Sequence, residues 1–178
     1  MSRLTVWDAA TGAEEVRTED EATIAATLRP LGVRFERWES PVALPDDASS
    51  EAILDACRPY LDGLMGDSGA GSADVISLTP DNPNGGALRQ KFLPEHVHTE
   101  DKVRFFVRGS GSFVMHVDGK VYDAHCTQGD PISVPAGTKH WFDAGEAPSF
   151  TALRVFQDTT GWTPHYTGDV ISERFRVG

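Results

Sequence analysis

Residues 94–145 read PEHVHTEDKVRFFVRGSGSFVMHVDGKVYDAHCTQGDPISVPAGTKHWFDAG, and this stretch decides the fold. Short runs rich in β-branched and aromatic residues, such as 103–107 and 131–134, are separated by turn residues. Asp118-Gly119, between two such runs, is among the strongest short signals for a hairpin. Strands in hairpins, rather than strands alternating with helices, predict a small antiparallel barrel.

Two histidines open the stretch. His96 and His98 are one residue apart, so in an extended chain both rings point to the same face. His140 follows the turn sequence Pro135-Ala136-Gly137, which would aim it back toward them. Neutral imidazoles suit Fe, Ni, Zn or Cu, whereas Mg and Ca prefer oxygen ligands. An isolated His-x-His pair is as often a surface feature, but the surrounding strands favour a metal site in the barrel mouth.

The flanking sequence adds helices and further strands. A capping box at Thr18–Glu21 precedes Ile24 and Leu28 and predicts a helix of about three turns. Apolar residues at helical spacing between Ile53 and Leu64 predict a second helix. Further strands are predicted at 4–7, 32–38, 75–78, 87–93 and 150–156, the fourth of which would deliver His96. The prediction is an all-β dominated (α+β) fold with two or so helices packed outside, forming a single domain over residues 1–178.

Composition narrows the class of protein. The 178 residues are 39% hydrophobic and 24% charged, typical of a globular chain. The formal charge of -11 argues against nucleic acid and against anionic membrane surfaces. No run approaches the ~18 apolar residues of a spanning helix, and the start lacks the apolar core of a signal peptide, so a cytoplasmic protein is expected. Cys57 and Cys126 are expected to be buried apolar groups.

Two motifs in this stretch resemble those of the cupin superfamily. The second cupin motif is a Gly, five residues, Pro-x-Gly, two residues and His, and it is met in full by Gly129, Pro135, Gly137 and His140. The first is His-x-His, three or four residues, a Glu, six residues and a Gly. It is met by His96, His98 and Gly109, but Lys102 stands at the Glu position. The resemblance implies a double-stranded β-helix, or jelly-roll, barrel.

Within the cupins the chain resembles the acireductone dioxygenases of methionine salvage. The resemblance spans nearly the whole chain and is carried by sequence segments such as 103–107, 132–138, 140–143, 150–154 and 166–169. It implies a dioxygenase that binds one Fe(II) or Ni(II) per chain through three His and one Glu. The substrate would be the enediol 1,2-dihydroxy-3-keto-5-methylthiopentene, cleaved with O2. With iron the family gives the 2-keto acid 2-keto-4-methylthiobutyrate and formate, and with nickel methylthiopropionate, formate and CO.

Lys102 departs from this family pattern. An ammonium about 4 Å from a dication would be repelled by roughly 8 kcal/mol at an effective dielectric near 20. Four outcomes are open. Lys102 turns away and leaves a three-His centre, or it coordinates as a neutral amine. Otherwise Glu100 or Asp101 supplies the missing carboxylate, with Glu100 the possible substitute ligand, or the site binds metal weakly or not at all.

Other residues are carried over from the family by position. Arg104 resembles the arginine that balances the charge of the bound enolate, and with Lys102 it is a catalytic candidate. Arg154 resembles a second basic residue of the substrate pocket. Glu95 resembles an acceptor that orients a ligand histidine. The expected aromatic walls of the pocket are Phe92, Phe142 and Trp162.

Two readings compete with an acireductone dioxygenase. One is a diverged cupin enzyme that acts on another enediol or small anion, with Lys102 as proton donor or carbonyl-binding amine. The other is a cupin that binds a small molecule without turning it over. The expected partners are the enediol and O2, with no nucleic acid and no membrane, and the expected state is a monomer or small homo-oligomer. His116 and His125, outside the cupin ligand positions, are expected to be structural.

Overall fold

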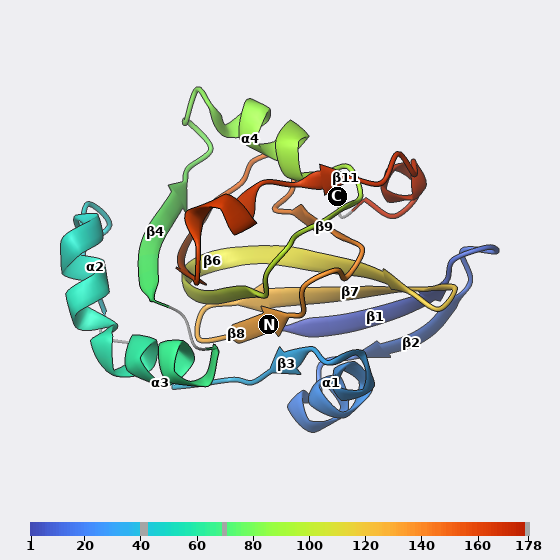
Figure 1. Ribbon diagram of the computed structural model, residues 1–178, viewed down its shortest axis with the longest axis horizontal. Coiled ribbons are helices and arrows are strands. Elements are labelled where there is room, and N and C mark those ends of the chain that lie inside the picture. Colours follow the sequence, from blue (N-terminus) through green and yellow to red (C-terminus); the bar gives the residue numbers. More distant parts are fainter. Residues whose placement is uncertain (40–42, 69–70, 177–178) are drawn as a thin grey trace.

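The computed structural model describes residues 1–39, 43–68 and 71–176. Two antiparallel sheets, joined through the long strand β6 (Lys102–Val117), form the body of the molecule (Figure 1). The other strands are β1 (Arg3–Asp8), β2 (Glu14–Thr18), β3 (Arg34–Phe35), β4 (Ser72–Leu78), β5 (His96–Val97), β7 (Lys120–Thr127), β8 (Pro131–Val134), β9 (His140–Asp143), β10 (Phe150–Phe156) and β11 (His165–Tyr166). The sheet-dominated prediction is confirmed.

Strand β6 belongs to both sheets. Its first half pairs with β8 and β10, and its second half pairs with β7 and β9. The strand that contains the predicted run 103–107 is longer than that run and continues through Gly109, which has a positive φ of 66° near a register shift against β10. Glycine accepts this conformation without a Cβ penalty, so the chain bends from one sheet into the other without breaking.

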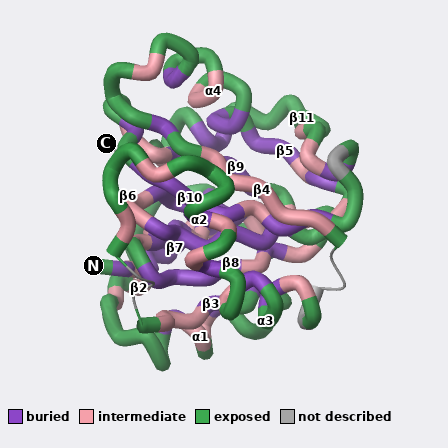
Figure 2. Tube along the Cα trace, turned by 90° about the vertical axis from the view of Figure 1, so that its left-hand side faces the viewer, coloured by how far each residue is buried: buried purple, intermediate pink, exposed green. Residues whose placement is uncertain are grey.

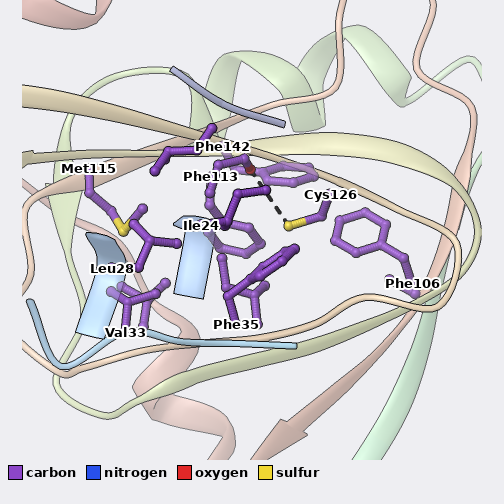
Figure 3. Close-up of a cluster of buried hydrophobic side chains, with 14 of the residues drawn as sticks. Ile24, Leu28, Val33, Phe35, Phe106, Phe113, Met115, Cys126 and Phe142 are labelled. Carbon is purple, nitrogen blue, oxygen red and sulfur yellow. Dashed lines mark hydrogen bonds between the residues drawn. The ribbon is translucent and has the colours of Figure 1, made fainter. Parts of the chain in front are cut away.

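The largest buried apolar cluster combines side chains of both sheets. Figure 2 shows the strands as mostly buried and the turns as exposed. Phe106, Phe113 and Met115 of β6 enter one cluster with Ile24 and Leu28 of α1 (Glu21–Leu28), as Figure 3 shows. Alternate side chains of a strand share a face, which explains how Phe113 and Met115 both reach this cluster.

Four α-helices among the described residues lie outside the sheets. Helix α1 begins at the N-cap Asp20, whose side chain accepts from Thr23 N, and it packs next to β3. The single helix expected around 53–64 is two, α2 (Ser50–Ala56) and α3 (Arg58–Ser68). Pro59 explains the break, because it has no N–H to donate to the carbonyl of Asp55.

Residues 87–93 are not the predicted strand. They lie in helix α4 (Gly85–Phe92) and its C-cap Leu93, and this helix packs beside β9 (Figure 1). Leu88, Arg89, Gln90 and Lys91 are all good helix formers, and their propensity favours the helix over a strand. Pro94 then excludes further helix, and the chain enters β5 extended.

Three short 3-10 helices complete the described chain: η1 (Arg29–Leu31), η2 (Thr159–Trp162) and η3 (Ile171–Glu173). Across the described residues, every helix is too short or too polar to cross a membrane.

Candidate metal centre

Three histidine rings converge where β5 pairs with β9. His96 and His140 are paired residues of these adjacent strands, and His98 follows β5 by one residue. The ring centroids are 4.6 Å apart for His96 and His140, 4.9 Å for His96 and His98, and 5.2 Å for His98 and His140. One nitrogen of each ring lies within 4.8 Å of one nitrogen of each other ring, and all three residues are buried. The structure therefore brings together the three predicted ligands.

Backbone carbonyls fix the tautomer of each ring. Nδ1 lies 2.7 Å from Pro94 O in His96, 3.2 Å from Thr163 O in His98 and 2.8 Å from Thr138 O in His140. Because a carbonyl oxygen only accepts, each Nδ1 carries the proton and donates it. The lone pair of every ring is then on Nε2, the atom left for a metal.

Burial keeps all three imidazoles neutral. It lowers the pKa of His98 to about 2, helped by the nearby charge of Lys102, and that of His140 to about 3, helped by His96. Burial also lowers the pKa of His96. A neutral imidazole is the form that binds a metal, so no proton must leave these rings at neutral pH.

Lys102 is buried beside the histidines. Its Nζ donates to Gly161 O at 2.6 Å and lies 4.2 Å from the centroid of the Trp162 ring. Burial lowers the pKa of Lys102 to about 8, although the charge of Glu100 opposes the shift. The side chain is thus mostly an ammonium at neutral pH, and its proton is directed at a carbonyl.

The acidic neighbours of Lys102 do not replace the missing carboxylate. Glu100, the predicted substitute ligand, accepts from Gln157 N at 2.8 Å and from Asp158 N at 3.2 Å. Asp101 accepts from Ala136 N at 2.9 Å. Neither belongs to the group formed by the three histidines. The structure does not bring Glu100 into this group, because its carboxylate accepts from the backbone of residues 157 and 158 instead.

Glu95 also differs from its prediction. Its carboxylate accepts from His116 Nδ1 at 2.8 Å and from Thr167 Oγ1 at 2.6 Å, whereas each ligand histidine donates to a backbone carbonyl. Glu95 immediately precedes β5, and neighbouring side chains of an extended chain point to opposite faces, so Glu95 and His96 point apart. Glu95 therefore orients His116, a histidine outside the centre.

The two arginines near the centre have different surroundings. Arg154 makes a two-pronged ion pair with Asp74, at 2.8 and 2.5 Å. Arg104 is buried, and its Nε and Nη1 have no hydrogen-bond partner in the described part of the chain. Its guanidinium stacks on Phe142 at 4.4 Å. Burial, and then the charge of Arg154, lower the pKa of Arg104 to about 9, which leaves it positive at neutral pH.

An apolar cavity lies next to Arg104. Phe92 and Phe142, two of the predicted walls, line it together with Ile76, Leu88 and Phe150. The Phe92 ring, one wall of the cavity, is 6.1 Å from the ring of His96. Trp162, the third predicted wall, lies on the side of His98, 6.2 Å from its ring.

Comparison with known proteins identifies the family. The profile of the family described as ARD/ARD' family matches residues 4–164. The chain belongs to this family. An acireductone dioxygenase of Acidiphilium cryptum is 67% identical over 99% of both chains, and that of Granulibacter bethesdensis is 64% identical over 98% of both. The family resemblance predicted from the motifs is thereby confirmed.

A solved structure of a member of the ARD/ARD' family supports the fold. It is described as acireductone dioxygenase from Bacillus anthracis with cadmium ion in active center. Its TM-score is 0.81 at 31% identity, with 93% of this chain and 98% of that chain covered. The predicted cupin barrel is confirmed by this match.

The side chains that the present chain offers to a metal fit a first-row transition ion only in part. Three neutral, buried imidazoles with free Nε2 atoms suit Fe(II) or Ni(II). The carboxylate that the family resemblance placed fourth is missing, because Lys102 occupies that position and donates a proton instead of an electron pair.

Sequence reasoning missed the groups that hold the histidines. The acceptors are main-chain carbonyls of Pro94, Thr138 and Thr163, and Gly161 O holds Lys102. Residue types carry no signal for a carbonyl, so only the path of the chain could reveal them. Asp74, which forms an ion pair with Arg154, lies opposite it in the pairing of β4 with β10, a pairing that the sequence did not predict.

Proposed function

We propose that this chain is an acireductone dioxygenase with a three-histidine metal centre. It cleaves 1,2-dihydroxy-3-keto-5-methylthiopentene with O2. The observation that carries the proposal is the convergence of three buried, neutral imidazoles with their Nδ1 protons committed to carbonyls. The names of relatives that match this chain over nearly its full length support the same activity.

His96, His98 and His140 would hold one Fe(II) or Ni(II) per chain. Such an ion supplies a Lewis-acid and redox centre at which an enediol and O2 react. By resemblance to the family, iron leads to 2-keto-4-methylthiobutyrate and formate, and nickel to methylthiopropionate, formate and CO. Placing the residues in these roles rests on the free Nε2 atoms and the burial of the site.

Arg104 is suited to an anionic substrate. A buried guanidinium whose N–H groups lack partners is stabilised by an anion that enters beside it. The enediolate would place its charge near Arg104 and Lys102 and its methylthio tail in the apolar cavity of Phe92 and Phe142. Arg154, already paired with Asp74, would contribute less charge to the substrate.

The lost carboxylate favours a second candidate, a cupin that binds the small molecule without turning it over. Both candidates take a small molecule as partner, with no nucleic acid and no membrane. A cytoplasmic location and a monomeric or small homo-oligomeric state stay predictions.

The test combines metal analysis with a reaction in the absence and presence of air. Purified protein is expected to hold a first-row metal near one per chain. Mixing it anaerobically with an acireductone analogue and then adding O2 is expected to give rapid loss of the enediol absorbance. Binding of the analogue without that loss would support the second candidate, and no binding at all would contradict both.

A further inference from the structure

Residues 157–163, here called the strap, lie against one side of the three histidines. At the end of the strap, Thr163 O accepts the Nδ1 proton of His98 at 3.2 Å. The Trp162 ring lies 6.2 Å from that of His98. The position of the strap thus decides whether His98 has its proton acceptor. His96 and His140 need no such segment, since each donates to a carbonyl two residues before it.

Glu100 holds the beginning of the strap. One carboxylate oxygen accepts from Gln157 N at 2.8 Å and the two oxygens share Asp158 N at 3.2 and 3.3 Å. Asp158 in turn caps the short helix η2 by accepting from Thr160 N at 2.9 Å. Hydrogen bonds from backbone N–H groups to a carboxylate are charge-assisted and stronger than neutral ones.

Lys102 holds the strap further along. Its ammonium donates to Gly161 O and lies over the Trp162 ring. Glu100 and Lys102 both follow His98 closely in sequence. The negative Glu100 accepts from N–H groups at the start of the strap, and the positive Lys102 donates to a carbonyl near its end. Both charges are therefore used in fixing its path.

Gly161 shows how closely Glu100 fits. A Cβ at position 161 would lie 1.7 Å from Glu100 Oε1 and 2.2 Å from its Cδ. The carboxylate therefore fills the space where any other residue would have a side chain. An alanine at 161 would force the Glu100 side chain to move, and with it the acceptor of the two strap N–H groups.

We propose that Glu100 is a positioning residue for the metal centre: it fixes the strap so that Thr163 holds the Nδ1 proton of His98 and leaves Nε2 free for a metal. The inference rests on the proposed function, since it needs His98 to be a ligand. It also assigns Glu100 a task other than ligation.

The direct readout is the tautomer of His98 in metal-free protein. Two-dimensional NMR of the imidazole nitrogens, with ¹⁵N-labelled histidine at neutral pH, distinguishes an Nδ1–H ring from an Nε2–H ring. The wild type is expected to show Nδ1–H alone for His98. Glu100→Ala and Gly161→Ala are each expected to give a mixture, while His96 and His140 stay as they are, because their acceptors do not lie in the strap.

Two comparisons separate positioning from general damage to the fold. Gly63→Ala, where a Cβ meets nothing within 4 Å, is the control for the glycine change. In the double variant Glu100→Ala with Gly161→Ala, the second change is expected to add little, because the group with which it collides is gone. Glu100→Gln, which keeps an acceptor oxygen, is expected to retain most of the Nδ1–H form.

Metal affinity provides a second measurement. Loss of a group that orients a ligand typically weakens metal binding 10–100-fold, so Glu100→Ala is expected to weaken Co(II) or Ni(II) binding about 10-fold. A single Nδ1–H signal for His98 in a folded Glu100→Ala variant would overturn the proposal. If the tautomer shifts but the wild type binds no metal, the positioning by Glu100 stands and the proposed function fails.

Discussion

Lys102 places a positive charge near His98, one of the residues proposed to hold the dication. Replacing it by Glu would remove that charge and offer a carboxylate to the ion, so Lys102→Glu is expected to raise the affinity for Ni(II) or Fe(II) at least tenfold. Two unit charges 4 Å apart interact by about 4 kcal/mol at an effective dielectric near 20, so even part of that change exceeds a factor of ten. Isothermal titration of metal-free protein measures the affinity.

The matched control for this change is Lys102→Gln, which removes the charge without adding a ligand. It is expected to bind metal more tightly than the wild type and less tightly than Lys102→Glu. Equal metal affinities of all three proteins would mean that the charge of Lys102, held by Gly161 O, has no effect on metal binding.

A second residue, Asp123, couples the stability of the fold to pH. It is buried, and its Oδ1 has no hydrogen-bond partner in the described part of the chain. Burial raises the pKa of Asp123 from an ordinary 3.8 to about 6. The folded state therefore favours the protonated acid, and this contribution to stability is complete below pH 3.8 and is lost as the pH rises through 6.

Asp123→Asn keeps the shape and removes the charge. At pH 7.5 the variant is expected to be more stable than the wild type by roughly 3 kcal/mol, the equivalent of that rise in pKa. At pH 4 the difference is expected to shrink toward zero. Urea denaturation of both proteins at the two pH values measures this difference in the free energy of unfolding. The same difference at both pH values would show that the pKa of Asp123 is not raised.

For individual residues, the sequence predicted the candidate metal ligands better than the groups that hold them in place. His96 and His98 share a face because of strand geometry, and His140 follows a turn motif of fixed length, so their meeting could be predicted. The partners of Glu95 and Glu100 depend on the path of residues 157–167, which come far later in the chain. No local pattern encodes that approach.

Among the elements, β6 joins the sheets through Gly109. A Cβ at Gly109 would lie 1.9 Å from Ser149 O. Because Ser149 O is a backbone atom, a change of side-chain rotamer cannot relieve this collision. Gly119 has a similar φ of 75° but open space around its Cβ position. Comparing substitutions at the two glycines therefore distinguishes the free-energy cost of a positive φ from the added cost of a steric collision.

Gly119→Ala is expected to lower the free energy of unfolding by about 1 kcal/mol, the cost of the left-handed conformation alone. Gly109→Ala is expected to lower it by at least about 3 kcal/mol, because the collision adds to the strain. Chemical denaturation of the two variants measures both values. Similar losses would mean that β6 and β10 separate at this point with little cost.

The elements themselves were predictable where one physical signal dominated. The hairpin at Asp118-Gly119 follows from its turn residues, and it forms between β6 and β7. Helix α4 was missed because a run of eight residues supports either period, and its helix-forming side chains were the deciding signal. The division of α2 from α3 required attention to a single proline.

For the whole molecule, the centre links strands that are distant in sequence. A metal bound by His96, His98 and His140 ties β5 to β9 in the folded state and finds no such arrangement in the unfolded chain. At a free concentration of 100 times Kd the ion is expected to stabilise the protein by about 2.7 kcal/mol. For a chain of this size that is a rise in Tm of roughly 5–10 °C.

Thermal unfolding with a chelator and then with added Ni(II) measures this rise. His140→Ala is the control, since it removes one ligand and leaves the others in place. An equal rise in that variant would place the stabilising ion elsewhere on this acidic molecule.

The indole of Trp162, so near His98, has an optical consequence. Open-shell ions such as Ni(II) and Fe(II) quench the emission of an adjacent indole, whereas Zn(II), with its filled d shell, leaves it bright. The distance of 6.2 Å between the two rings puts this tryptophan within range of any ion held by the histidines. Its fluorescence therefore reports, without an added dye, which kind of ion the protein carries.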